Sequence, residues 1–237
     1  MIMKAISVII CAFNEENTIA SVIESTNSCP NIGQIVVVND GSTDNTGQII
    51  RHLSESIDLC YINLLPNRGK GFSMASGLEL ATGEIIVFLD ADIENLTKLH
   101  INKLVNPILN DTADMVMGQP GQTFINARYN PFKVFTGQRA VKREHILPIV
   151  EDIRFTKFGV ETYINLYYQS TGLNSKSLIL NGMVHRTKFE KMKRVRAIVE
   201  LLLEAKEIVV TLLENTDLVK KCVLRHLNTK RIILKRI

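Results

Sequence analysis

The sequence predicts an α/β protein with a Rossmann-like, mostly parallel sheet flanked by helices. Strand-like apolar runs alternate strictly with helix-like segments over about the first 90 residues, and such alternation indicates βαβ units with right-handed crossovers. The apolar runs are short and end in Gly, Asn or Asp, which is typical of strands buried on both faces of a sheet. Three of the runs are followed by acidic residues, and the carboxyl ends of parallel strands meet at one edge of a sheet.

The individual segments support this arrangement in chain order. Short apolar runs bounded by turn residues predict strands over residues 5–12, 34–38, 59–64, 84–89 and 114–118. Cap-type polar residues and helical spacing predict helices over residues 14–28, 46–53, 71–81 and 97–109. After residue 118 the alternation gives way to Gly, Pro, Asn and aromatic residues, which indicates long loops and short helices over one edge of the sheet.

Composition limits the class of protein. The chain has 237 residues, of which 46% are hydrophobic and 22% charged, so it can bury one large core. Cys11, Cys29, Cys60 and Cys222 lie far apart, and this argues against a zinc site or a disulfide framework and favours a reducing cytoplasm. No run of about 18 apolar residues occurs, so neither a signal peptide nor a membrane span is expected.

The charge is divided unevenly along the chain. Residues 1–185 carry 14 basic and 18 acidic side chains, whereas residues 186–237 carry 14 basic and 6 acidic ones. We therefore expect two parts, a body at residues 1–187 and a basic, amphipathic helical extension at residues 188–237. The body is net acidic, and we expect no nucleic-acid partner.

Acidic side chains follow three predicted strands. Glu15 follows the first strand, Asp40 the second, and Asp90 and Asp92 the fourth, so all of them should converge on one edge of the sheet. Two carboxylates spaced at i and i+2 can share a divalent cation, or one can bind the metal while the other binds a ribose hydroxyl. A phosphorylated ligand needs a metal bridge in such an acidic cleft, so the pattern predicts a nucleotide together with a divalent ion.

A glycine-rich segment, residues 67–71 (NRGKG), opens the third predicted helix. It lacks the third glycine of a dinucleotide-binding motif, because Met74 stands there, and it lacks the Ser or Thr of a P-loop, because Gly71 stands there. Arg68, Lys70 and free backbone N–H groups still suit phosphate. A flexible, solvated turn remains the alternative.

Taken together, four motifs resemble a known family. Residues 9–16 (IICAFNEE), 38–46 (VNDGSTDNT), 67–71 (NRGKG) and 88–92 (FLDAD), in this order and spacing, resemble glycosyltransferase family 2, which has a GT-A fold. The resemblance covers residues 5–185 and implies that the body is a nucleotide-sugar-binding catalytic domain. The sequence departs from the family pattern at Cys11, a position where proline is common in the family.

The resemblance implies roles for individual residues. Ala12, Glu15 and Asp40 would contact the base and ribose, Asp90 would lie at the ribose and metal, and Asp92 would ligate Mg²⁺ or Mn²⁺ and so take part in catalysis. The full set expected to bind the donor is Ala12, Phe13, Glu15, Asp40, Gly69, Lys70, Asp90, Ala91 and Arg139.

Later segments resemble a subgroup that acts on phosphorylated acceptors, the dolichyl- and polyprenyl-phosphate sugar synthases and glucosyl-3-phosphoglycerate synthases. The matching segments are residues 136–140 (TGQRA), 158–161 (FGVE) and 182–186 (GMVHR). By this resemblance Arg139 would bind phosphate oxygens bidentately. Glu161 would be the general base or would orient the acceptor, and His185 would be a third metal ligand. The alternatives are that Arg139 is a surface arginine, that Glu161 is only an acid at the start of a helix, and that His185 has a structural role.

The expected function is metal-dependent transfer of a sugar from a UDP- or GDP-sugar to an acceptor, such as a polyprenyl phosphate or another phosphorylated or lipid acceptor. The family implies inversion at the sugar C1, whereas glucosyl-3-phosphoglycerate synthases retain its configuration, and the sequence leaves both open. A sugar-nucleotide nucleotidyltransferase is a rival, but it would have a Gly-rich basic loop where residues 12–15 read AFNE. A non-catalytic nucleotide-sugar-binding module is a second rival.

The extension contains two kinds of helical pattern. Over residues 195–213 polar side chains recur at three- and four-residue steps and leave the rest of the helix surface apolar. Beyond residue 216 basic and apolar residues mix at helical spacing, which suits an anionic membrane surface. We therefore expect a cytoplasmic protein that contacts the inner face of the cell membrane, or else an extension that packs on the body or on a second subunit of a homo-oligomer.

Overall fold

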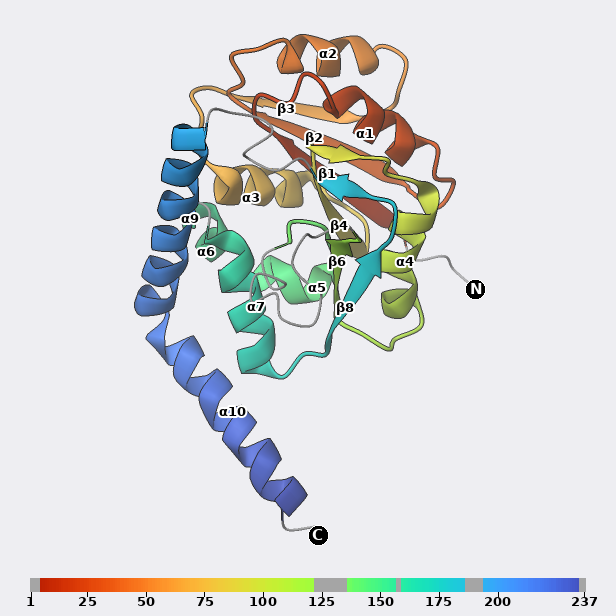
Figure 1. The fold of residues 1–237 in the computed structure, drawn as a ribbon. Helices are drawn as coiled ribbons and strands as arrows, with labels where there is room; N and C mark the ends of the chain where they lie inside the picture. The colour runs from red at the N-terminus through yellow and green to blue at the C-terminus, as the bar shows by residue number, and fades with distance from the viewer. Residues whose placement is uncertain (1–4, 122–135, 157–158, 186–193, 235–237) are drawn as a thin grey trace.

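A seven-stranded sheet forms the centre of the molecule, with strands in the order β3-β2-β1-β4-β7-β6-β8 (Figure 1). The structure is a computed structural model that describes residues 5–121, 136–156, 159–185 and 194–234. The strands of this sheet are β1 (Ile6–Ala12), β2 (Gln34–Asp40), β3 (Cys60–Leu64), β4 (Ile85–Asp90), β6 (Met115–Pro120), β7 (Arg139–Lys142) and β8 (Ser175–Leu180). A separate pair joins β5 (Ile93–Glu94) to β9 (Val184–His185).

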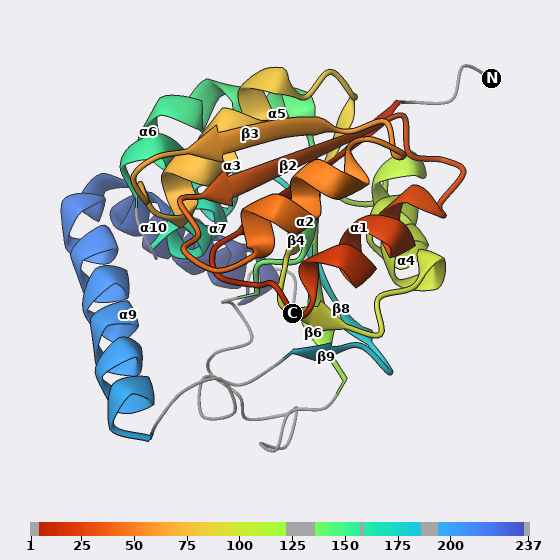
Figure 2. The same ribbon diagram turned by 90° about the horizontal axis from the view of Figure 1, so that it is seen from above.

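Helices cover both faces of the sheet, as the view from above shows (Figure 2). One face carries α1 (Ile19–Asn27), α2 (Thr46–Leu53) and α4 (Lys98–Leu109). The other face carries α3 (Lys70–Leu80), α5 (Arg143–Ile146), the 3₁₀ turn η2 (Leu147–Ile149), α6 (Val150–Phe155) and α7 (Val160–Thr171). The chain continues into α9 (Arg194–Glu214) and α10 (Thr216–Leu234).

The two-residue period of a strand explains why the central strands are apolar throughout. In β4, Ile85, Val87 and Leu89 pack into the core beneath α1, α2 and α4. Ile86 and Phe88, which point the opposite way, pack into the core beneath α3, α6 and α7. Both faces of the strand are therefore buried, and each fully buried aliphatic side chain stabilises the fold by about 2 kcal/mol.

The predicted parallel alternation holds for β1 to β4 and then changes. β1, β2, β3 and β4 are parallel, as expected from their crossovers. β7 is inserted between β4 and β6 and runs antiparallel to both, although the sequence indicated only loops and short helices there. A four-residue strand that contains Arg139 and Lys142 carries no apolar run, so periodicity could not reveal it. This insertion places Arg139 opposite Phe88 of β4.

The strand register aligns the carboxyl ends of β1, β2 and β4. Cys11 of β1 lies between Val38 of β2 and Asp90 of β4, and Ala12 lies opposite Asn39. The loops that leave these three strands therefore start at one level of the sheet. This edge is where ligands of open α/β sheets bind.

The two C-terminal helices lie along one side of the body, and α10 then leads away from it (Figure 1). Thr211 of α9 approaches Gly159 so closely that a Cβ at Gly159 would overlap its hydroxyl. Arg225 of α10 donates from Nη2 to the Thr171 carbonyl of α7 at 2.9 Å. Within the described ranges, none of the helices has both the length and the apolar character needed to cross a membrane. The division into parts at residues 1–187 and 188–237 stays a prediction.

Candidate active site

The loops that follow β1 and β2 are joined by hydrogen bonds. The Asn14 N–H donates to Ser42 Oγ at 2.9 Å, and Asn14 Oδ1 accepts from the Thr43 N–H at 2.8 Å. The Glu15 N–H donates to Thr46 Oγ1 at 2.8 Å. Asn14 has a φ of 57°, a left-handed conformation that asparagine tolerates better than most residues. The first two motifs therefore form one surface.

Asp40, the last residue of β2, binds the backbone of the glycine-rich loop. Its Oδ1 accepts from the Arg68 N–H at 2.8 Å, and its Oδ2 accepts from the Gly69 N–H at 2.9 Å. Asn67 Nδ2 also donates to the Asp40 carbonyl at 2.9 Å. Gly41 has a φ of 71°, and a Cβ there would lie 2.6 Å from the Asn67 nitrogen, so only glycine fits this approach. Two hydrogen bonds thus connect the backbone of the loop to the Asp40 carboxylate.

Lys70, the first residue of α3, connects two acids from distant parts of the chain. Its Nζ lies 2.7 Å from Asp90 Oδ1 and 2.6 Å from Glu161 Oε1, with 26% of the lysine side chain exposed. Gln138 Nε2 donates to the other oxygen of Asp90, Oδ2, at 2.8 Å. Burial alone would lower the pKa of Lys70, but Asp90 and Glu161 outweigh it and raise that pKa above its usual value. Lys70 therefore carries its charge throughout the neutral range.

Arg139 lies beneath this group and is completely buried. Its Nη2 donates to the Thr136 carbonyl at 2.7 Å, while Nε and Nη1 have no hydrogen-bond partner among the described residues. Burial holds the pKa of the guanidinium below its usual value, and nearby Glu161, Asp90 and Tyr168 oppose that shift. The half-buried Lys70 and the buried Arg139 thus balance two carboxylates. The predicted phosphate contact of Arg139 stays a prediction, but its burial favours an interior, charge-balancing role instead.

Asp92 lies two residues beyond the end of β4 and is half-buried. Its carboxylate oxygens are hard donors of the kind that Mg²⁺ and Mn²⁺ prefer. In the described ranges no three His, Cys, Asp or Glu side chains come together as a metal site. Oxygen ligands from Asp92, from a bound diphosphate and from water would together make a donor set that fits Mg²⁺.

His185 is brought to this part of the fold by its backbone. In the β5–β9 pair it lies opposite Ile93, the residue after Asp92. Its side chain lies outside the described part of the chain, and so do Phe158 and Arg186. The predicted metal ligation by His185 and by Asp90 stays a prediction, and both carboxylate oxygens of Asp90 already accept hydrogen bonds.

The remaining predicted donor residues lie along the same edge. Ala12 and Ala91 are buried, Glu15 is half-buried, and Phe13 is 46% exposed. Gly69 is the residue before α3 and has a φ of 92°. Glu161 lies in the first turn of α7 and is 8% exposed, so it is a helix-start acid that also faces the site through Lys70.

Sequence reasoning missed what residues 136–138 contribute to the site. Gln138 precedes Arg139 in a segment that the resemblance singled out, yet only Arg139 received a role there. Thr136 Oγ1 donates to Gln138 Oε1 at 2.7 Å, and this orients the amide so that its Nε2 points to Asp90. A Cβ at Gly137 would overlap the Asp90 carboxylate, so the spacing of the whole segment depends on a glycine. No pattern in one sequence signals such a supporting hydrogen bond.

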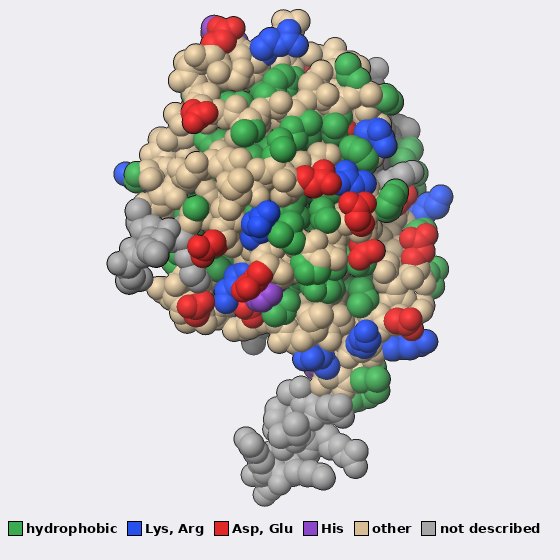
Figure 3. Space-filling model, turned by 180° about the vertical axis from the view of Figure 1, so that it is seen from behind, with side chains coloured by type: hydrophobic (Ala, Val, Ile, Leu, Met, Phe, Trp, Pro, Cys, Tyr) green, Lys and Arg blue, Asp and Glu red, His purple; other side chains and the backbone are tan. Residues whose placement is uncertain are grey.

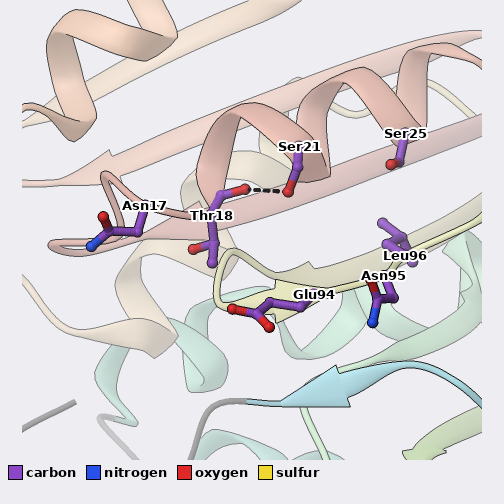
Figure 4. Close-up of a pocket in the computed structure, with 7 residues that line it drawn as sticks. All are labelled: Asn17, Thr18, Ser21, Ser25, Glu94, Asn95 and Leu96. Carbon is purple, nitrogen blue, oxygen red and sulfur yellow. Dashed lines mark hydrogen bonds between the residues drawn. The ribbon is translucent and has the colours of Figure 1, made fainter. Parts of the chain in front are cut away.

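A hollow of about 320 Å³ lies beside this edge, between α1 and β5 (Figure 4). Its lining is mostly hydroxyl and amide: Asn17, Thr18, Ser21, Ser25, Glu94, Asn95 and Leu96. Thr18 connects it to the edge, because Thr18 Oγ1 donates to Glu15 Oε2 at 3.4 Å. Neither Asp92 nor Lys70 lines the hollow, so we do not identify it with the acidic edge.

The sheet with helices on both faces, and the acidic residues at one of its edges, define a GT-A type of α/β domain. The sequence model described as "Glycosyl transferase family 2" matches residues 7–169, and the chain belongs to this family.

Curated relatives match part of the chain. A poly-β-1,6-N-acetyl-D-glucosamine synthase of Staphylococcus epidermidis is 33% identical over 91 residues, which are 38% of this chain and 22% of the relative. An undecaprenyl-phosphate 4-deoxy-4-formamido-L-arabinose transferase of Serratia proteamaculans is 31% identical over 99 residues, 39% of this chain and 30% of the relative. The chain thus spans less than a third of the length of these relatives.

Solved structures of glucosyl-3-phosphoglycerate synthase from Mycobacterium tuberculosis share the fold. The complex with Mn²⁺, UDP-glucose and phosphoglyceric acid has a TM-score of 0.68 and 24% identity, covering 92% of this chain and 80% of that one. The complex with Mg²⁺ and UDP has the same TM-score and identity, covering 89% and 79%. This likeness confirms the predicted GT-A fold.

Proposed function

We propose that the protein transfers a sugar from a UDP- or GDP-sugar to a phosphorylated acceptor, with a divalent metal bound at Asp92. The observation that carries this proposal is the convergence of three motif loops on one sheet edge, where Asp40 holds the glycine-rich loop and Lys70 lies between Asp90 and Glu161. Family membership supports glycosyl transfer as the reaction. The relatives named above are transferases and synthases of sugars.

The donor would lie along the ends of β1, β2 and β4. Ala12, Phe13, Glu15 and Asp40 would contact the base and ribose, and the N–H groups in the first turn of α3 would face the diphosphate. Mg²⁺ or Mn²⁺ at Asp92 would neutralise charge on the diphosphate of the donor. The crystallised synthases with UDP and either metal support this choice. Lys70, which carries its charge at neutral pH, would contribute a second cation at the same phosphates.

Transfer would be a displacement at the sugar C1. The acceptor oxygen forms a bond to C1 while the bond from C1 to the diphosphate oxygen breaks, and the nucleoside diphosphate leaves with the electron pair. For a hydroxyl acceptor, Glu161 would receive the proton that the hydroxyl loses. For a phosphate acceptor, whose oxygen is already anionic, Glu161 and its ion pair with Lys70 would serve to position the acceptor.

Calorimetry tests the donor and the metal directly. UDP-glucose, UDP-N-acetylglucosamine and GDP-mannose would be titrated into the protein with Mn²⁺ and again with EDTA. We expect binding of at least one nucleotide sugar with Mn²⁺, because unscreened acidic side chains repel a diphosphate. Asp92→Ala should abolish the effect of Mn²⁺, whereas Glu94→Ala on β5 is a nearby control that should preserve it. Equal binding in EDTA and in Asp92→Ala would refute the metal assignment.

Steady-state kinetics separates donor binding from transfer. Glu161→Gln should leave the Kd for the donor nearly unchanged and lower kcat, since Glu161 is assigned to the acceptor side. A full transfer rate in this variant would eliminate its catalytic role. Absence of transfer by the wild-type protein, with donor binding intact, would favour the rival of a non-catalytic nucleotide-sugar-binding module.

The stereochemical outcome distinguishes two subclasses. We propose inversion at C1, as family 2 implies, and the anomeric configuration of the product can be read by proton NMR. A retained configuration would favour the alternative, a reaction like that of glucosyl-3-phosphoglycerate synthases. Formation of a nucleotide sugar from a nucleoside triphosphate and a sugar 1-phosphate, with release of diphosphate, would instead indicate a nucleotidyltransferase.

The basic character of α10 supports a lipid phosphate as the acceptor. Residues 216–234 carry five basic and one acidic side chain. Val223, Leu224 and Leu227 are exposed among them, and Lys and Arg side chains gather where the C-terminal helix leaves the body (Figure 3). Each cation near an anionic membrane adds about 1 kcal/mol of attraction. The undecaprenyl-phosphate transferase relative supports an acceptor of this class. Such a protein would bind the inner face of the cell membrane peripherally.

Vesicle co-sedimentation tests the membrane contact. The full chain should bind phosphatidylglycerol vesicles more strongly than phosphatidylcholine vesicles, and Lys220→Glu together with Lys221→Glu should remove the preference. Both lysines are exposed, so this change should spare the fold. Lack of a preference for anionic lipid would leave a small soluble phosphorylated acceptor as the better choice. The remaining predicted partner is a second copy of the chain.

A further inference from the structure

The outer face of α9 is unusually apolar for a helix surface in contact with water. Five large aliphatic side chains on this helix are between 47% and 68% exposed: Val199, Leu202, Leu203, Val209 and Leu213. The helix lies at the outer edge of the molecule in both ribbon views (Figures 1 and 2). A continuous exposed apolar surface of this kind marks an interaction site more often than it faces solvent.

The spacing of these residues is that of a helix–helix seam. Val199, Leu202, Val209 and Leu213 fall at the a and d positions of a heptad repeat, and Lys206 takes the a position between them. Leu203 widens the same face at an e position. The 3,4-residue repetition gives one continuous apolar stripe along the helix, and a second helix can pack its own a and d positions against such a stripe.

The opposite face of α9 is already occupied by the body. Thr211 is buried against Gly159, and its hydroxyl donates to the Glu207 carbonyl one turn earlier at 2.8 Å. Ile208 and Asn215, on the same side, are half-buried. The seam lies on the far side from these contacts, so the described residues of the body that contact α9 at Thr211 do not cover it.

The net charge of α9 differs from that of the neighbouring helix α10 and does not favour binding to an anionic membrane. Residues 194–214 carry three basic and four acidic side chains, in contrast to the strongly basic α10. An anionic membrane would not attract such a helix, because its net charge is slightly negative. A second helix of the same composition meets no strong net repulsion, and a two-fold interface uses the same patch on both chains.

We propose that the seam of α9, formed by Val199, Leu202, Lys206, Val209 and Leu213, is a self-association surface that packs against α9 of a second copy of this chain. Lys206 is the single charged residue of the seam, and a charged a position lowers the stability of a helix pair while it restricts how the pair forms. The opposite face of the same helix contacts the N-terminal end of α7, which carries Glu161, because Thr211 packs there against Gly159.

Sedimentation-velocity ultracentrifugation of the full chain over a range of micromolar concentrations tests the proposal. The wild type should sediment as a dimer at high concentration and dissociate on dilution. Leu202→Glu should sediment as a monomer at every concentration, because it places a carboxylate within the seam. Lys206→Leu should lower the dimer dissociation constant at least tenfold, since it makes the seam apolar throughout.

A matched control comes from α10. Leu224→Glu introduces the same charge at a residue that is 59% exposed, outside the seam, and it should leave the dimer intact. Far-ultraviolet circular dichroism should show an unchanged helix content in all variants. A monomeric wild type would overturn the proposal, and so would a dimer that Leu202→Glu leaves intact. Loss of vesicle binding in Leu202→Glu together with a monomeric wild type would assign the face to a membrane instead.

Discussion

The ammonium of Lys70 lies 2.6 Å from Oε1 of Glu161, although 90 residues separate them in the chain. The same nitrogen lies 2.7 Å from Asp90 Oδ1, so one cation satisfies two carboxylates that would otherwise repel each other. The lysine of the glycine-rich loop therefore holds the sheet edge and the start of α7 together.

Lys70→Met should destabilise the protein by about 2 kcal/mol, because it leaves two neighbouring carboxylates without their shared cation. Removal of one partner of a buried pair costs about 3–5 kcal/mol, and partial exposure of Lys70 reduces this figure. Urea denaturation measures the difference. Lys98→Met, at an exposed residue of α4, is the control and should change stability by less than about 0.5 kcal/mol. Equal stability of the Lys70 variant and the wild type would contradict the role given to this ion pair.

Asp40→Asn should lower stability by about 1–2 kcal/mol and weaken nucleotide-sugar binding at least tenfold. An amide has one accepting oxygen, so its NH₂ group would face either the Arg68 or the Gly69 N–H, where the carboxylate now accepts from both. Denaturation and calorimetry measure the two effects. Asp58→Asn, at an exposed residue, should produce neither effect. Normal donor binding by the Asp40 variant would show that the loop is held by other contacts.

Gly71→Ala should destabilise the protein by about 2 kcal/mol or more. Alanine has a higher helix propensity than glycine, by about 1 kcal/mol, but a Cβ at residue 71 would overlap the carbonyl oxygens of Ile153 and Thr156. The clash should therefore outweigh the propensity. Gly33→Ala is the control, since its nearest neighbour would lie at 3.7 Å. Thermal denaturation of both variants tests this, and a higher melting temperature for Gly71→Ala would disprove the close packing of α3 on α6.

Asp114→Asn should reduce stability at pH 7 by about 1 kcal/mol and have no effect in acid. Burial by itself would raise the pKa of Asp114, but the Asn174 N–H at 2.9 Å and Lys142 at 3.2 Å outweigh it and lower the pKa below 3.8. A carboxyl whose pKa is lower in the folded state stabilises the fold above its unfolded pKa, and it loses this contribution as pH falls through the folded value. Such a charged hydrogen bond is worth about 1–3 kcal/mol.

Free energies of unfolding measured from pH 7 downward test this pH dependence. The curves of the wild type and Asp114→Asn should converge below about pH 4. Asp217→Asn is the control, because this side chain is 88% exposed and pairs only loosely with Lys220 at 3.6 Å. A constant difference between the Asp114 variant and the wild type at all pH values would contradict the prediction.

Most helices and strands of the body could be predicted because they depend on local patterns. The predicted helix at residues 71–81 is found as α3, Lys70–Leu80, and the predicted strand at residues 84–89 as β4, Ile85–Asp90. Each shifts by about one residue, as element ends commonly do. The acids at strand ends could also be placed, because parallel strands with right-handed crossovers bring their carboxyl ends to one side.

By itself, the sequence determined the alternation of strands and helices, the sheet covered by helices on both faces, and the sheet edge that carries Asp40, Asp90 and Asp92. It could do so because hydrophobic periodicity and the order of strands and helices can be recognised in short segments. The tertiary structure decided which side chains meet at that edge. Lys70 meets Asp90 and Glu161 because the first turn of α3, which packs on α6, lies beside the end of β4 and the start of α7. Arg139 is buried because β7 is inserted beside β4. Such contacts between distant segments depend on packing, and no local pattern encodes them.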